Sequence, residues 1–156
     1  MDSPLPVLTE GQERRERVVQ RVRAETGIDE AMIERLVRGF YARVRADELL
    51  GPVFESRIAD WEPHLRRMFA FWSSVALHSG VYHGDPMSRH VALPVDARHF
   101  DRWLALFTET ARGLCPPAAA ALFVDCAHRI ARSLEMGVAC ARGVLLAPGQ
   151  RYMEQT

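Results

Sequence analysis

Hydrophobic residues recur at helical spacing along most of the chain. The longest run has the spacing i, i+3, i+4, i+7, i+8, i+11 and consists of Ile33, Leu36, Val37, Phe40, Tyr41 and Val44. Because an α-helix has about 3.6 residues per turn, this spacing places these side chains on one helix face. No segment shows the two-residue alternation that is typical of a half-buried β-strand. The pattern therefore predicts an all-α protein.

Capping residues and prolines indicate where the helices begin and end. Thr9 and Gln12 have the spacing of a capping box, and Asp29 and Asp96 stand where N-caps are expected. We expect helices from Thr9 to about residue 25, after Asp29, from about Pro63, after Asp96, and over roughly 117–140. The apolar segment LLGPVF, residues 49–54, is expected to form a turn.

A much shorter helix is predicted within DPMSRHVALPVD, residues 85–96. Asp85 followed by Pro86 is typical of an N-cap and a first helical position. Pro94 ends the helix because it lacks an N–H group and restricts the residue before it. At most about two turns fit between the prolines, and His90 lies within them. So short an element raises the question of why it presents a histidine.

Length and charge limit the number of domains and the kinds of partner that the chain can have. The 156 residues suit one folded domain, which we place over 13–143, with a flexible N-terminal tail over 1–12 and a C-terminal tail over 144–156. With 20 basic and 20 acidic residues, the chain lacks the bulk basic field that favours nucleic-acid binding. The arginines between residues 14 and 23 are interleaved with glutamates, which favours a solvated helix face.

The cysteine count and the hydropathy of the chain argue against disulfide-rich, zinc-binding and membrane-spanning proteins. Cys115, Cys126 and Cys140 are an odd number without a C-x-x-C pair, which argues against a disulfide framework and a zinc site. No segment approaches the ~20 apolar residues that cross a bilayer, and no secretory signal is evident. We therefore expect a cytoplasmic protein without a membrane partner.

Four polar residues lie on apolar helix faces or in the short helix: Tyr41, His64, His90 and Trp103. A buried tyrosine or tryptophan needs a hydrogen-bond partner, which either the core or a ligand can supply. His64 stands at the start of its helix and fits either an inward position or contact with solvent. His90 fits either a surface histidine or a ligand to a metal.

The remaining histidines are weaker candidates for metal ligands. His78 and His83 flank loop glycines, but no H-x-x-x-H or H-E-x-x-H spacing supports a metal site there. His99 and His128 lie on long amphipathic helices, where exposure to solvent is the simpler expectation.

The combination of these residues indicates a cofactor site more strongly than any one of them does. One histidine on a separate short helix can offer a single neutral nitrogen to a metal, while long helices supply aromatic and aliphatic walls. A flat, apolar, iron-bearing cofactor needs that combination, with a few hydrogen-bond donors across its plane. Zinc or non-haem iron would instead need three or four clustered protein ligands, which the sequence does not display.

The stretches FYARVRADELLGPVF, WEPHLRRMFAFW and HVALPVDARHFDRWLALF resemble the bacterial truncated haemoglobins, specifically their third group. The resemblance extends from about residue 27 to about residue 138. It implies a truncated globin-like fold, a two-over-two helical sandwich around a haem pocket, whose proximal segment is mostly loop. The short helix with His90 would then be the reduced proximal element.

The resemblance also implies roles for individual residues. His90 would be the proximal ligand of the iron of haem b, and Tyr41, His64 and Trp103 would be the distal, ligand-stabilising residues. The further cofactor-contacting positions are Phe54 on the haem face, Phe71 and Trp72 at haem-wall and structural positions, and Met68, where the family often has a branched aliphatic residue.

We therefore expect a haem protein that binds O₂, NO, CO or peroxide for oxygen chemistry or detoxification. Reaction with nitric oxide or a peroxidase-like activity would need an external electron donor or reductase, because the chain shows no flavin or nicotinamide fingerprint. Whether the protein is an enzyme stays open at this point. The alternatives are an oxygen or redox sensor, and an all-α interaction module without a cofactor.

Overall fold

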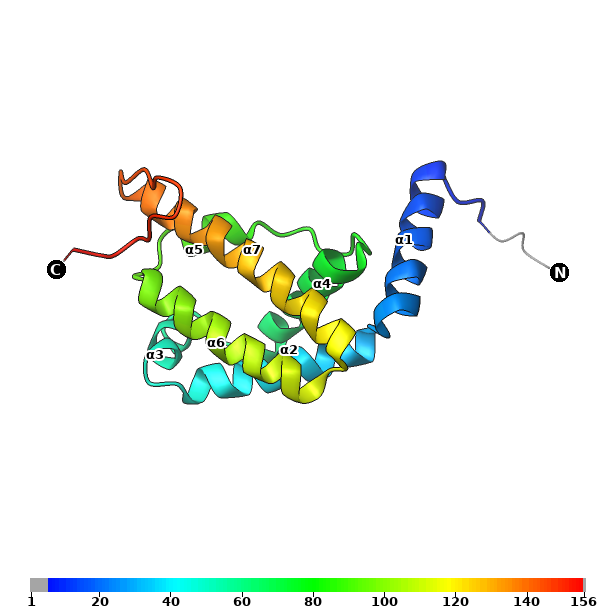
Figure 1. Ribbon diagram of the computed structural model, residues 1–156, viewed down its shortest axis with the longest axis horizontal. Helices are drawn as coiled ribbons and strands as arrows, with labels where there is room; N and C mark the ends of the chain where they lie inside the picture. Colours follow the sequence, from blue (N-terminus) through cyan, green and yellow to red (C-terminus); the bar gives the residue numbers. More distant parts are fainter. Residues whose placement is uncertain (1–5, 156) are drawn as a thin grey trace.

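The computed structural model describes residues 6–155. Within this range the regular elements are all α-helices, as the hydrophobic spacing predicts (Figure 1). They are α1 (Glu10–Thr26), α2 (Glu30–Ala46), α3 (Leu50–Glu55), α4 (Trp61–Leu77), α5 (Pro86–His90), α6 (Ala97–Leu114) and α7 (Pro117–Ala141). No helix in this part of the chain has both the length and the apolar character needed to cross a bilayer.

The predicted capping residues begin the helices. Thr9 and Gln12 form a reciprocal capping box at α1, and Asp29 accepts a hydrogen bond of 2.8 Å from the N–H of Met32 at the start of α2. Asp85 caps α5 and Asp96 caps α6. Side chains that accept bonds from the first free N–H groups of a helix thus fix where the main elements start.

The expected turn over 49–54 is wrong, because residues Leu50–Glu55 form the short helix α3. Leu49, at the N-cap position, offers no capping side chain. Instead the carboxylate of Asp47 accepts hydrogen bonds from the N–H groups of Leu49 and Leu50, at 3.2 and 3.0 Å. Pro52 falls within the first turn, where its missing N–H costs no helical hydrogen bond.

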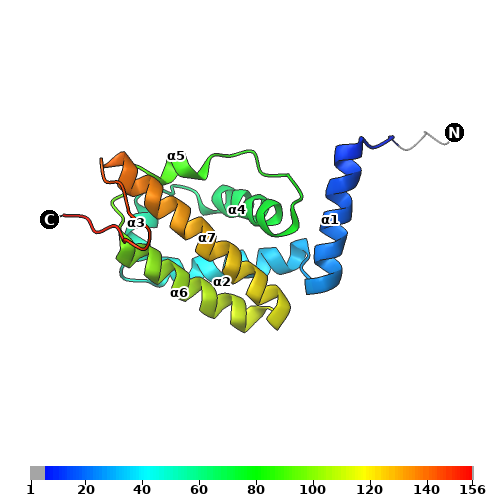
Figure 2. The same cartoon turned by 45° about the horizontal axis from the view of Figure 1, so that its top comes forward.

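The core lies between two helix pairs. α2 packs on α4, α6 packs on α7, and the pairs meet through α2 with α6 and α4 with α7, an arrangement that can be followed in Figures 1 and 2. At the centre Trp72 of α4 stacks on Phe107 of α6, with ring centroids 4.7 Å apart. This is the two-over-two architecture that the sequence resemblance implies.

The two ends of the described chain differ. α1 projects away from the helical body (Figures 1 and 2) and has no buried residue, so its arginines and glutamates form the predicted solvated face. The helix begins at Glu10, within the range predicted as a tail; residues 1–5 and 156 of the predicted tails lie outside the described residues. After α7 the chain leaves helical structure but returns to the body, where Tyr152 is buried.

Candidate functional site

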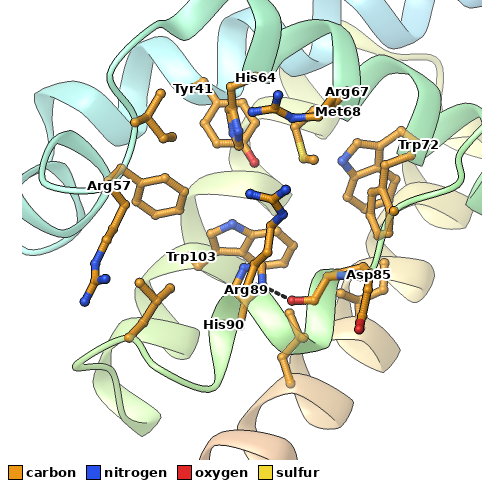
Figure 3. Close-up of a pocket in the computed structure, with 18 of the residues that line it drawn as sticks. Tyr41, Arg57, His64, Arg67, Met68, Trp72, Asp85, Arg89, His90 and Trp103 are labelled. Atoms are coloured by element: carbon orange, nitrogen blue, oxygen red, sulfur yellow. Dashed lines mark hydrogen bonds between the residues drawn. The ribbon is translucent and has the colours of Figure 1, made fainter.

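A cavity of about 980 Å³ lies between α2, α3, α4, α5, α6 and α7, at the upper end of the size range of ligand pockets. The eight residues singled out from the sequence all line it: Tyr41, Phe54, His64, Met68, Phe71, Trp72, His90 and Trp103. Figure 3 shows Tyr41 and His64 on one side of this space and His90 on another. The fold thus brings together residues that are up to about sixty positions apart in the sequence, as chain reversal between packed helices allows.

His90 lies at the end of α5, and one of its ring nitrogens is engaged in a hydrogen bond. Its Nδ1 is 2.6 Å from the carbonyl oxygen of Pro86, the contact drawn as a dashed line in Figure 3. A carbonyl oxygen can only accept, so Nδ1 carries the proton and donates it. Nε2 therefore keeps a free lone pair, which is the state of a histidine that binds a metal through Nε2. The short helix α5 therefore has a structural reason to present a histidine: its first carbonyl fixes the orientation of the His90 ring.

Tyr41 brings a hydroxyl donor to the cavity from α2. The residue is 6% exposed, and its hydroxyl makes no hydrogen bond to any other group of residues 6–155; Figure 3 shows its oxygen turned toward the cavity. Burial raises the pKa of the Tyr41 phenol, so the group stays protonated. The ring is held by Phe40 and Phe54, which meet it at centroid distances of 5.0 and 5.8 Å.

His64 stands beside Tyr41 on α4. The inward position is the one observed: its Nε2 is buried and has no hydrogen-bond partner in the described part of the chain. Burial, and next the positive charge of Arg67, lower the pKa of His64 to about 4. The imidazole is therefore neutral at pH 7. A buried polar atom without a partner is unfavourable, so this nitrogen is expected to meet a bound molecule.

Trp103 is held rigidly by ring stacking. Its indole lies parallel to the ring of Phe107, with centroids 5.5 Å apart and an angle of 11°, and Trp72 stacks on the same phenylalanine. Phe40 meets Trp103 edge-on at 5.4 Å. No protein group among residues 6–155 accepts a hydrogen bond from the Trp103 indole N–H, which leaves this donor available to the cavity.

Three arginines that the sequence did not single out also line the cavity: Arg57, Arg67 and Arg89. Within the described residues none of the three forms an ion pair with a carboxylate, whereas many other arginines of this chain do. No sequence signal distinguishes them, because the basic residues of the chain are all arginines. The cavity thus combines an apolar interior with positive charges free to meet an acidic group.

The other histidines occupy different places. The expectation that His99 is exposed is wrong: its side chain is 13% exposed, and its Nδ1 accepts a hydrogen bond of 3.1 Å from the N–H of Asp96 in the capping box of α6. His128 is exposed, as expected. His78 ends α4 in a left-handed conformation, whereas His83 and His99 both line the cavity.

The donor set fits a haem group and does not fit a metal held by several protein side chains. The residues described contain no cluster of three or more His, Cys, Asp or Glu that could hold a metal ion. The cavity instead offers the oriented imidazole of His90, an orphaned His64 nitrogen, aromatic walls and unpaired guanidinium groups. A flat apolar macrocycle with one open axial position and acidic edges complements these features.

Comparisons with known proteins agree with this chemistry. The family model of the bacterial-like globins matches residues 24–115. The group 3 truncated haemoglobin Ctb of Campylobacter jejuni is 35% identical over 88 residues, which cover 53% of this chain and 69% of that protein. A crystal structure of group III truncated haemoglobin from Campylobacter jejuni superimposes with a TM-score of 0.64 and 30% identity, covering 69% of this chain and 88% of the other.

Proposed function

Since this chain belongs to the group III truncated haemoglobins of the bacterial-like globin family, we propose that it holds haem b through Nε2 of His90 and binds O₂, NO or CO in the cavity. The observation that carries this proposal is the hydrogen bond from His90 Nδ1 to the carbonyl of Pro86. It fixes the tautomer and leaves the other ring nitrogen free to bind iron. The volume of the cavity supports a bound cofactor over a cofactor-free module, whose core would be filled by side chains.

Haem supplies an iron that binds diatomic ligands and exchanges electrons. The role of the chain is to orient hydrogen-bond donors toward such a ligand. The hydroxyl of Tyr41 and the indole N–H of Trp103 have no protein acceptor in the described chain and can donate to partial negative charge on a ligand. Each such bond contributes about 1–3 kcal/mol in a dry pocket. Neutral His64 adds a third polar group beside Tyr41.

The arginines of the cavity explain how the acidic edge of haem would be recognised. Arg57, Arg67 and Arg89 line the cavity and have no carboxylate partner in the described chain. Guanidinium groups bind carboxylates through charge-assisted hydrogen bonds. We assign them to the two propionate groups of the cofactor, while Phe54, Met68 and Phe71 form apolar contacts with the macrocycle.

Several donors around one ligand predict slow ligand release. Slow release suits oxygen chemistry, such as conversion of nitric oxide to nitrate or use of peroxide, better than oxygen delivery. Either reaction requires electrons from a separate donor: re-reduction of the oxidised iron by a reductase after nitric oxide is converted, or a reducing substrate when peroxide is consumed. Steady-state consumption of nitric oxide by the haem-loaded protein with an added reductase distinguishes this activity from a sensor, which would bind the ligand without turnover.

The test of haem ligation is the His90→Ala variant. Loss of the axial nitrogen is expected to abolish stable one-to-one haem uptake, measured by absorption titration of the haem-free protein. His128→Ala, a change at an exposed histidine of α7, is the matched control and should take up haem like the wild type. An unaltered Soret band after His90→Ala would show that another residue binds the iron.

A further inference from the structure

We propose that Gly137 and Arg142, at the C-terminal end of α7, are positioning residues that set where His90 stands relative to the cavity. The proposal rests on the proposed role of His90 as the iron ligand. Both residues lie beyond residues 24–115, where the family model matches. Each contacts a different part of the segment that contains His90.

Gly137 leaves room for a side chain that α5 places on α7. The side chain of Met87, on α5, lies directly over this glycine: a Cβ atom added at position 137 would overlap Sδ of Met87 and lie 2.9 Å from its Cε. Glycine is unfavourable inside a helix relative to alanine, so its presence within α7 calls for a packing reason. The contact with Met87 supplies that reason: the end of the Met87 side chain packs on the glycine, and an alanine there would push that side chain out of its place on α7.

Arg142 holds the chain just after His90. Its Nη2 donates a hydrogen bond of 2.7 Å to the carbonyl oxygen of Leu93, and the N–H of Leu93 in turn donates to the carbonyl of His90 at 3.0 Å. Leu93 itself lines the cavity. The guanidinium is thus linked to the His90 backbone through one residue, and a change at Arg142 is transmitted to the ligand segment.

The segment after α7 keeps Arg142 in place. We call residues 142–154 the C-terminal strap; it runs back from the end of α7 toward the start of α6 (Figures 1 and 2). The Arg142 guanidinium lies over the ring of Tyr152 at 5.9 Å and faces the carboxylate of Glu154 at 3.6 Å. The carbonyl of Tyr152 accepts a bond of 2.7 Å from the N–H of Ala97. The strap therefore fastens the loop between α5 and α6 from outside the cavity.

These contacts matter because the His90 ring has little freedom of its own. Its Nδ1 is bonded to the carbonyl of Pro86 at the other end of α5, so the ring moves with the helix as one body. Shifting α5 away from α7, or loosening the loop after it, displaces Nε2. Groups that orient a metal ligand commonly alter metal affinity by about 10- to 100-fold when they are changed.

The test compares Gly137→Ala and Arg142→Met with matched controls in the haem-loaded protein. Gly113→Ala is the control for the glycine, because a Cβ at that position of α6 meets nothing within 4 Å. Arg132→Met, at an exposed arginine of α7, is the control for the arginine. We expect a shifted iron–histidine stretching band in resonance Raman spectra and roughly 10-fold faster haem loss in both test variants, with neither change in the controls.

The outcomes separate this proposal from the proposed function. If His90→Ala abolishes haem uptake but the band and the rate of haem loss are unchanged in Gly137→Ala and Arg142→Met, the positioning proposal is overturned and haem ligation by His90 stands. If the wild type takes up no haem, or His90→Ala keeps its spectrum, the proposed function fails. Hydrogen exchange of residues 86–95 in the haem-free protein then decides. It must be faster in Gly137→Ala and Arg142→Met but not in Gly113→Ala and Arg132→Met, and equal exchange in the test and control variants overturns the proposal. Faster hydrogen exchange throughout all helices of the test variants would also overturn the positioning proposal, because it would indicate general destabilisation.

Discussion

The rings of Tyr41 and His64 stand perpendicular to each other, with centroids 5.2 Å apart, although one residue belongs to α2 and the other to α4. Trp61 packs against both, at 5.9 Å from Tyr41 and 5.6 Å from His64. The guanidinium of Arg45 covers Trp61 at 4.6 Å. This cluster fixes two polar groups beside the cavity before any ligand arrives, so little ordering is left to be done on binding.

Replacing Tyr41 by phenylalanine tests the first of these groups. The change removes one hydroxyl and keeps the ring that packs on Phe40 and Phe54. If the hydroxyl donates to O₂, the O₂ dissociation rate of the ferrous protein should rise by about tenfold, which corresponds to about 1.4 kcal/mol. Stopped-flow displacement of O₂ by CO measures this rate.

Tyr152→Phe is the control for that measurement. It removes the same atom from a buried tyrosine that is not among the residues lining the cavity. Its O₂ dissociation rate should equal that of the wild type. An unchanged rate in Tyr41→Phe would remove this hydroxyl from ligand stabilisation and leave Trp103 and His64 as the donors.

The sequence predicted the features that arise from local patterns. Capping residues such as Asp29 and Asp96 act within three residues of themselves, and apolar spacing identifies the buried face of a single helix. His90 was found because two prolines isolate its helix. The roles of Tyr41, His64 and Trp103 around one cavity followed from the family resemblance, since periodicity alone left Tyr41 and Trp103 as core or ligand-contacting residues and His64 as either inward or solvent-facing.

Features that depend on distant contacts were not predicted. Gly137 is explained by Met87, fifty positions away, and Arg142 by Leu93. His99 was expected in solvent because its helix is amphipathic, yet the capping bond from Asp96 draws it inward. The cavity arginines are identical in type to the solvated ones. Only the fold separates an arginine that has a carboxylate partner from one that has none.

The free energy of unfolding should depend on pH in the acid range because His64 is buried in its neutral form. The pKa of His64 is lowered from 6.5 to about 4, first by burial and then by Arg67. The unfolded chain therefore binds more protons between these values, so the contribution of His64 is complete above pH 6.5 and is lost as the pH falls toward 4. We expect the free energy of unfolding of the haem-free protein to fall by roughly 1–2 kcal/mol over this interval, since solvent at the partly exposed ring reduces the full effect of the shift.

Urea unfolding followed by circular dichroism at several pH values measures this loss. His64→Leu should remove that part of the pH dependence, whereas His128→Leu, at an exposed position, should keep it. Parallel pH profiles for the wild type and His64→Leu would mean that His64 is protonated as easily in the folded protein as in the unfolded chain.

Asp96 should stabilise the fold in a different pH range. Burial alone would raise the pKa of Asp96, but hydrogen bonds from the side chain of Arg98 and the N–H of Glu154 lower it to about 2, from 3.8. Its contribution is therefore present above pH 3.8 and is lost as the pH falls toward 2. Asp96→Asn keeps a capping side chain but loses the charge, which should cost about 2 kcal/mol at pH 7.

The cost of Asp96→Asn is measured by urea unfolding at pH 7 and again at decreasing pH. The difference from the wild type should shrink between pH 3.8 and 2. Asp125→Asn is the control: its ion pair with Arg129 is exposed, with side chains 66% and 67% accessible, and such pairs contribute little. Equal costs for the two substitutions would contradict a special role for the buried carboxylate.

The cavity arginines should make the protein bind haem more tightly than the dimethyl ester of haem, which lacks the two propionate charges. If Arg57, Arg67 and Arg89 bind the propionates, the wild type should bind haem more tightly than its dimethyl ester. Exposed pairs contribute up to about 1 kcal/mol each, so the triple alanine variant should lose roughly tenfold or more of that preference. Arg66→Ala is the matched control, because Arg66 is already near Glu62, at 3.9 Å. Absorption titrations with both porphyrins measure the preference, and a triple variant that retains it in full would place the propionates elsewhere.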